Sequence, residues 1–81
     1  MLNDDIKLLR REIDNIDDEL LKLLIRRTHV VDKIGIHKQS SKNVVDKTRE
    51  AEVILRLLKL HNGNFSKDSL VRIWREIFHT S

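Results

Sequence analysis

Residues 6–37, IKLLRREIDNIDDELLKLLIRRTHVVDKIGIH, decide the fold of this chain. Mostly apolar residues recur every seven positions in two columns. The first column is Ile6, Ile13, Leu20, Arg27 and Ile34, and the second is Leu9, Ile16, Leu23, Val30 and His37. On a helix this spacing keeps one stripe of side chains turned toward a partner helix. The pattern therefore predicts a long helix that packs along this stripe, and we call the two columns together the seam.

Arg27 interrupts the seam with a positive charge. The residues three and four positions away are Leu23, Leu24, Val30 and Val31, and none of them is acidic. Because burying an unpaired guanidinium costs several kcal/mol, an anionic partner is expected. That anion could be a distant Glu of the chain or a bound ligand, and the side chain could also extend to solvent.

The composition limits the class of protein. Eighty-one residues without Pro or Cys, of which 36% are charged, suit one small helical domain over residues 1–81. The lack of a secretory or membrane-length apolar run favours a cytoplasmic protein without a membrane partner. A net charge of +3 is a mild bias toward anionic partners and falls far short of the dense basic patch that is typical of a nucleic-acid binder. The histidines lack metal-ligand spacing, and they are His29, His37, His61 and His79.

Three helices are expected. The first runs from residue 3 to about residue 39, which is about 54 Å of helix. After a polar loop, the second runs from about residue 45 to residue 60, and Gly63 is expected to end it in the left-handed conformation. The third starts with Ser66 as N-cap, with Phe65 packed on Leu70. The second helix is expected to carry Val53, Leu57 and Leu60 on one face. The buried face of the third is expected to consist of Leu70, Ile73, Trp74, Ile77 and Phe78.

The first helix is too long and too apolar for the two shorter helices to cover. It also carries Leu8, Leu21, Ile25 and Ile36 outside the seam. We therefore expect an all-α, intertwined antiparallel homodimer that is obligate. By contrast, Glu12, Glu19, Arg26 and Lys33, which recur every seven residues, are interpreted as a solvated face of mixed charge.

Antiparallel pairing would gather cations from two chains. Within one chain, Lys38 lies about 16 Å from Arg27 along the axis and Arg10 about 25 Å. If two copies cross near Leu21, Arg10 of one chain lies opposite Asp32 of the other, between Arg27 and Lys38. The pattern predicts a pocket for a small anion, with Arg49 and Glu50 beside it. Taken one at a time, Arg10 and Lys38 could equally be ordinary charged residues on the solvent-exposed face of a helix.

The ordered set Leu9-Arg10, Ile13, Asp17, Leu20-Leu21, Leu23-Leu24, Arg27, Gly35 and Lys38 resembles the first helix of the all-helical class of chorismate mutases. Residues 46–50, DKTRE, resemble the motif of that family's second helix. Residues 73–77, IWREI, are similar to the third helix of mutase modules fused ahead of other aromatic-biosynthesis domains. The resemblance covers nearly the whole chain.

The resemblance implies rearrangement of chorismate to prephenate, without a cofactor, in sites shared by two chains. It implies that Arg10 of the partner and Arg27 bind the substrate carboxylates, and that Lys38 donates to the ether oxygen. Further site residues are implied by the same alignment: Asp46 and Arg49 line the site, Glu50 accepts from the ring hydroxyl, and Ser81 contacts a carboxylate. The family also has a Gln one turn beyond the position of Ser81.

These residue types suit the reaction. A pericyclic rearrangement needs a dicarboxylate folded into a reactive shape and positive charge at the ether oxygen. Arginine matches carboxylates with two parallel hydrogen bonds, and lysine supplies a compact donor. Two alternatives remain open, an isochorismate-pyruvate lyase of the same fold and a non-catalytic helical module for dimerisation or nucleic-acid binding. In the second, Arg27 would only set the register of the seam.

Overall fold

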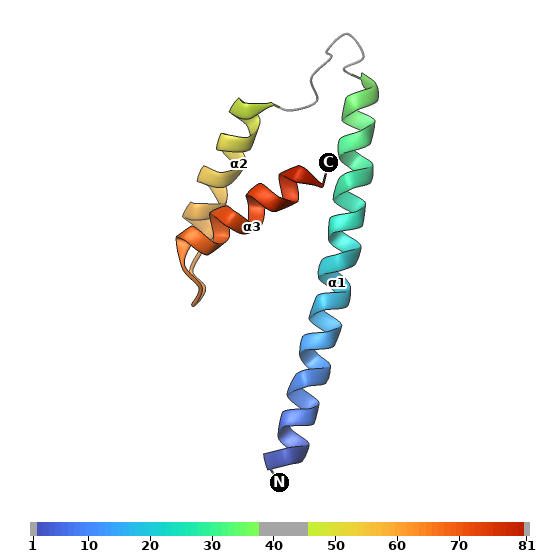
Figure 1. Ribbon diagram of the computed structural model, residues 1–81, viewed down its shortest axis with the longest axis vertical. Coiled ribbons are helices and arrows are strands. Elements are labelled where there is room, and N and C mark those ends of the chain that lie inside the picture. The colour runs from blue at the N-terminus through green and yellow to red at the C-terminus, as the bar shows by residue number, and fades with distance from the viewer. Residues whose placement is uncertain (1, 38–45, 81) are drawn as a thin grey trace. The chain divides into compact units, whose positions relative to one another are not determined.

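The computed structural model describes residues 2–37 and 46–80. They form three α-helices, α1 (Leu2–His37), α2 (Lys47–Leu60) and α3 (Lys67–His79), and these residues include no strand (Figure 1). The predicted all-α class and the three helices are confirmed. Lys38, the predicted loop at residues 39–43 and Ser81 lie outside the described residues.

α1 is a single helix of 36 residues, as expected from the seam. Asp4 and Asp5 lie in its first turn and His37 in its last, so these charges suit the helix dipole at both ends. The chain divides into two compact units, Met1–Val30 and Val31–Ser81, and their boundary falls inside α1. The single domain expected over residues 1–81 stays a prediction.

Side-chain caps fix the starts of the two shorter helices. The backbone of Asp46 is extended, with φ −114° and ψ 97°, and its carboxylate accepts a hydrogen bond from the Arg49 N–H. Ser66 has the same role for α3, because its Oγ accepts from the Ser69 N–H at 3.0 Å. The predicted Ser66 cap is therefore confirmed. α2 begins at Lys47, two residues after the expected start, because the Asp46 side chain accepts a hydrogen bond from an N–H group of the first turn and so acts as the N-cap.

The turn between α2 and α3 corrects one expectation. Gly63 does not have a positive φ, so it is not a left-handed cap. Instead α2 ends at Leu60, and the C-cap is His61, whose backbone N–H donates to the Leu57 carbonyl at 2.9 Å. The His61 ring then closes the turn: Nε2 donates to the Phe65 carbonyl at 2.6 Å, and Nδ1 lies 3.4 Å from the Gly63 N–H. Since a carbonyl only accepts, the proton of this imidazole is on Nε2.

The aromatic ring of Phe65 stacks on this imidazole, with 4.5 Å between the ring centroids. The contact predicted between Phe65 and Leu70 stays a prediction.

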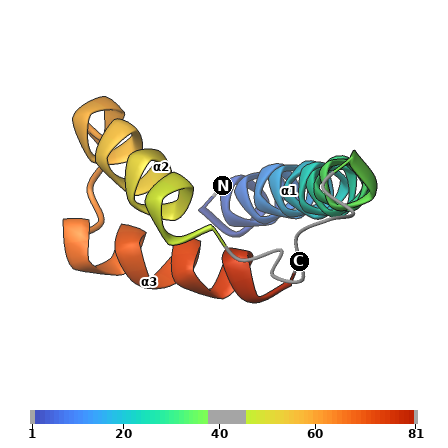
Figure 2. The same ribbon diagram turned by 90° about the horizontal axis from the view of Figure 1, so that it is seen from above.

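α2 and α3 lie side by side (Figure 2). The buried apolar side chains between them are Val53, Leu70 and Ile77. Leu57, Trp74 and Phe78 are half-buried, as part of the expected faces. Ile73, however, keeps 48% of its surface exposed, so the prediction that it is buried is wrong for the single chain. Leu60, on the same face of α2 as Val53, keeps 65% of its surface exposed. Two packed helices cover only the residues along their line of contact.

The seam of α1 is exposed along its length in the single chain. Its large apolar residues keep between 43% and 57% of their surface, and they are Ile6, Leu9, Ile13, Ile16, Leu20, Leu23, Val30 and Ile34. The residues outside the seam, Leu8, Leu21, Ile25 and Ile36, are exposed as well. Among the described residues, none of the helices combines the length and the hydropathy that a membrane span needs.

Candidate functional site

Arg27 lies on a half-buried strip of α1. The other members of the strip follow one another at helical spacing, and they are Leu24, Thr28, Val31 and Gly35. The Thr28 hydroxyl donates to the Ile25 carbonyl at 2.7 Å, which ties this polar side chain back to its own helix. Arg27 is thus the one cation on this strip in the described part of α1. Arg27 itself is half-buried, whereas the apolar residues of the seam on either side of it are exposed.

Arg10 is exposed and lies far from Arg27 on the same helix. Because α1 is continuous between them, a rise of 1.5 Å per residue separates the two by about 25 Å along the axis. A single chain therefore does not bring these two predicted carboxylate-binding residues to one small ligand.

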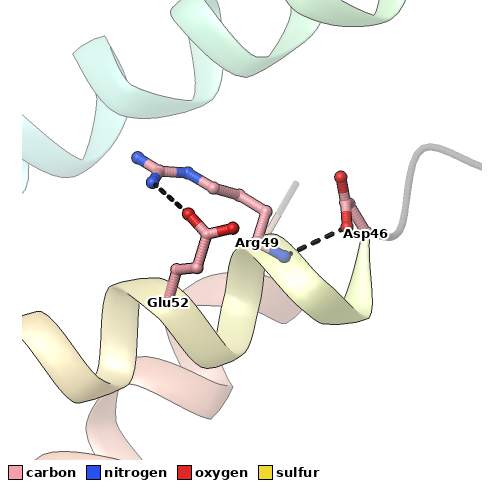
Figure 3. A network of polar contacts seen from close by, with 3 residues as sticks. All are labelled: Asp46, Arg49 and Glu52. Carbon is pink, nitrogen blue, oxygen red and sulfur yellow. Dashed lines mark hydrogen bonds and ion pairs between the residues drawn. The ribbon is translucent and has the colours of Figure 1, made fainter.

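The first turn of α2 holds three other predicted site residues. Asp46 Oδ1 accepts from the Arg49 backbone N–H at 3.0 Å (Figure 3). The Asp46 carbonyl accepts from the Glu50 N–H at 2.9 Å. Arg49 Nη1 lies 3.6 Å from Glu52 Oε2, with both side chains more than 60% exposed. The cap thus fixes the direction in which Arg49 and Glu50 leave the helix.

Glu50 differs from its charged neighbours in its burial. It is half-buried, whereas Arg49 and Glu52 are exposed. Its carboxylate is in the first turn of α2, where the helix dipole favours a negative charge. A carboxylate can accept a hydrogen bond from a ligand hydroxyl, and this is the role that the family resemblance implies for Glu50.

Two predicted site residues, Lys38 and Ser81, lie outside the described residues. Glu52 was not predicted, although the three-residue spacing Arg49–Glu52 could have indicated the pair. Within residues 2–37 and 46–80, no group of three or more His, Asp or Glu side chains is placed to hold a metal ion.

The comparison with known protein families identifies the class to which this all-helical chain belongs. The model of the family described as "Chorismate mutase type II" matches residues 9–81, so the chain belongs to this family. This confirms the resemblance drawn from the sequence.

Two curated proteins are similar to the chain, and both are named bifunctional chorismate mutase/prephenate dehydratase. The one from Aquifex aeolicus (strain VF5) is 42% identical over 79 residues, covering 91% of this chain and 22% of that protein. The one from Stutzerimonas stutzeri is 28% identical over 80 residues, with the same coverage of 91% and 22%. The chain thus spans about a fifth of the length of these relatives. No solved structure matches it significantly.

Proposed function

We propose that this chain rearranges chorismate to prephenate as an antiparallel homodimer in which each site uses residues of both chains. The observation that carries the proposal is the membership of residues 9–81 in the chorismate mutase type II family. The separation of Arg10 and Arg27 along a continuous helix supports a shared site, because one chain alone cannot bring both to a single substrate.

The distribution of apolar surface supports the dimer. The buried core of the described chain consists of three apolar residues between α2 and α3, whereas the seam of α1 is exposed. So small a core stabilises a folded monomer poorly, and a second copy would cover the seam. Folding and dimerisation would then be a single event.

The proposed roles follow the charges. Arg27 and the partner's Arg10 bind the two carboxylates of chorismate and hold the enolpyruvyl group over the ring. Lys38 donates to the ether oxygen, where negative charge develops as the carbon–oxygen bond breaks and the new carbon–carbon bond forms. Glu50 accepts from the ring hydroxyl, and Arg49 and Ser81 contact the substrate. All atoms of the substrate remain in the product, so the residues act by positioning and electrostatic stabilisation.

Asp46 has a different place in this proposal. Its carboxylate caps α2, and a second negative charge would not suit a substrate with two carboxylates. We therefore propose that Asp46 supports the site by fixing the first turn of α2 rather than through direct contact with a carboxylate.

Two assays test the function. The purified chain should convert chorismate to prephenate, and Arg27→Ala should abolish this conversion while the helix content stays the same. Formation of salicylate and pyruvate from isochorismate, without prephenate from chorismate, would assign the chain to the lyase alternative. If neither substrate is consumed, the chain would be a non-catalytic module, and a dianionic transition-state analogue should not raise its Tm.

A further inference from the structure

One column of charged residues on α1 is not used by the proposed reaction. It consists of Asp5, Glu12, Glu19, Arg26 and Lys33, which recur every seven residues. Each comes directly before a residue of the seam, so the column borders the seam along one side. The first three members are acidic and the last two are basic, so the sign changes once, between Glu19 and Arg26. We call this set the charge column.

Within residues 2–37 and 46–80, the side chains of the charge column are not part of the ion pairs of α2 and α3. All five side chains are exposed, and neighbours in the column are about 10 Å apart along the helix, too far to form ion pairs with one another. The ion pairs Arg49–Glu52 and Glu76–His79 lie on α2 and α3, outside the column. Five charges beside an exposed apolar seam are therefore available to a second helix.

In an antiparallel pair of α1 helices, the acidic residues of one charge column face the basic residues of the partner's column. When the two columns of the seam pack against each other, Leu20 lies level with the partner's Leu23, and Ile13 with the partner's Val30. Glu19 then lies within about 3 Å, along the axis, of the level of the partner's Arg26. Glu12 has the same offset from the partner's Lys33, and the two-fold symmetry repeats both pairs.

Other arrangements bring like charges together. A shift of seven residues in one direction pairs Glu12 with the partner's Arg26 but puts Glu19 against the partner's Glu19. A shift in the other direction pairs Glu19 with the partner's Lys33 but puts Arg26 against the partner's Arg26. Each shifted register therefore contains a like-charged pair that the unshifted register lacks. A parallel pair would place each column residue beside the partner residue five positions later. Glu12 would then meet the partner's Asp17, and Lys33 the partner's Lys38. The single change of sign thus favours one direction and one register.

We propose that the charge column fixes the antiparallel register of two copies of this chain through ion pairs between Glu12 and Lys33 and between Glu19 and Arg26. This rests on the proposed function, and it assigns the four residues a positioning role. The register that they favour is the one that brings Arg10 of one chain between Arg27 and Lys38 of the other. The column residues come directly before seam residues, whereas Arg10 comes directly after the seam residue Leu9, so the column borders the side of the seam opposite Arg10.

Two charge-reversal variants test the proposal. Glu12→Lys/Glu19→Lys makes the four pairing positions of the column basic, and Arg26→Glu/Lys33→Glu makes them acidic. Each variant alone should dimerise more weakly than the parent chain, with Kd raised on the order of 10²-fold at low salt and far less at high salt. An equimolar mixture should form heterodimers with parent-like Kd, because every pair is again of opposite sign. Sedimentation measures Kd without reference to activity.

The matched control is Asp18→Lys/Asp32→Lys, which changes the net charge as much as Glu12→Lys/Glu19→Lys does. Asp18 and Asp32 lie on the side of α1 away from the seam, so Kd should change less than about threefold. The column proposal would be overturned if the control variant dimerised as weakly as the column variants. It would also be overturned if the Kd of the mixed column variants were no lower than the Kd of each variant alone. A parent dimer that forms but does not convert chorismate would instead overturn the proposed function and leave the column intact. Chorismate turnover in the mixture, at near the parent rate, would support both.

Discussion

The carboxylate of Asp46 holds the Arg49 backbone N–H at 3.0 Å, so the residue that the family resemblance places in the site is also the cap of α2. Asp46→Ala should remove this bond and lower the free energy of unfolding by about 1 kcal/mol. Asp46→Asn keeps an accepting oxygen and should retain most of the stability. Chemical denaturation of the three chains measures the difference. Activity lost equally in both variants would show that the charge of Asp46 matters beyond the cap.

The tight turn after α2 gives a second prediction. A Cβ added to Gly63 would lie 3.2 Å from Cε1 of the His61 ring, and this ring is held by its bond to the Phe65 carbonyl. Gly63→Ala should therefore lower the free energy of unfolding by about 1 kcal/mol, through crowding rather than backbone strain. In a His61→Ala background the same substitution should be nearly neutral. An equal cost in both backgrounds would mean that the imidazole is not the obstacle.

Lys38 provides the clearest test of electrostatic catalysis. If its ammonium group donates to the ether oxygen, Lys38→Ala should lower kcat on the order of 10²–10³-fold, because the donor acts mainly in the transition state. Circular dichroism should show unchanged helix content. A change confined to KM would assign Lys38 to substrate binding alone.

The reaction is expected to need no cofactor. Turnover of chorismate by the purified chain should be the same before and after treatment with EDTA and exhaustive dialysis, because a pericyclic rearrangement requires only positioning and charge. Activity that returns only when a divalent metal ion is added would contradict this mechanism.

Much of the fold could be predicted because it depends on local patterns. The seven-residue spacing of α1 and the Ser66 cap are properties of nearby residues, and both were found where expected. Gly63 was misassigned because glycine is usual after a helix, whereas here the His61 side chain closes the turn. The burial of Leu60 and Ile73 could not be predicted because it depends on which helices cover them.

The candidate site could be predicted only in part, for the same reason. Arg27 was identified by a charge in an apolar seam, and it is half-buried as expected. The pair Arg49–Glu52 was not predicted, because the adjacent Glu50 was taken as the carboxylate that accompanies Arg49, whereas Glu52 lies one turn further along the helix. The joining of Arg10 to Arg27 depends on a second chain, and Lys38 and Ser81 lie outside the described residues.

Mixing two inactive variants tests the shared site most directly. Arg10→Ala and Arg27→Ala should each be nearly inactive as homodimers, since each lacks one carboxylate-binding cation in both sites. When the two chains are refolded together, about half of the dimers are mixed. One site of a mixed dimer has Arg27 from the first variant and Arg10 from the second, and the other site lacks both. Chorismate turnover should therefore return to about a quarter of the parent level, while variants mixed without refolding stay inactive. No recovery in mixtures that contain mixed dimers would show that Arg10 and Arg27 do not meet across the two chains.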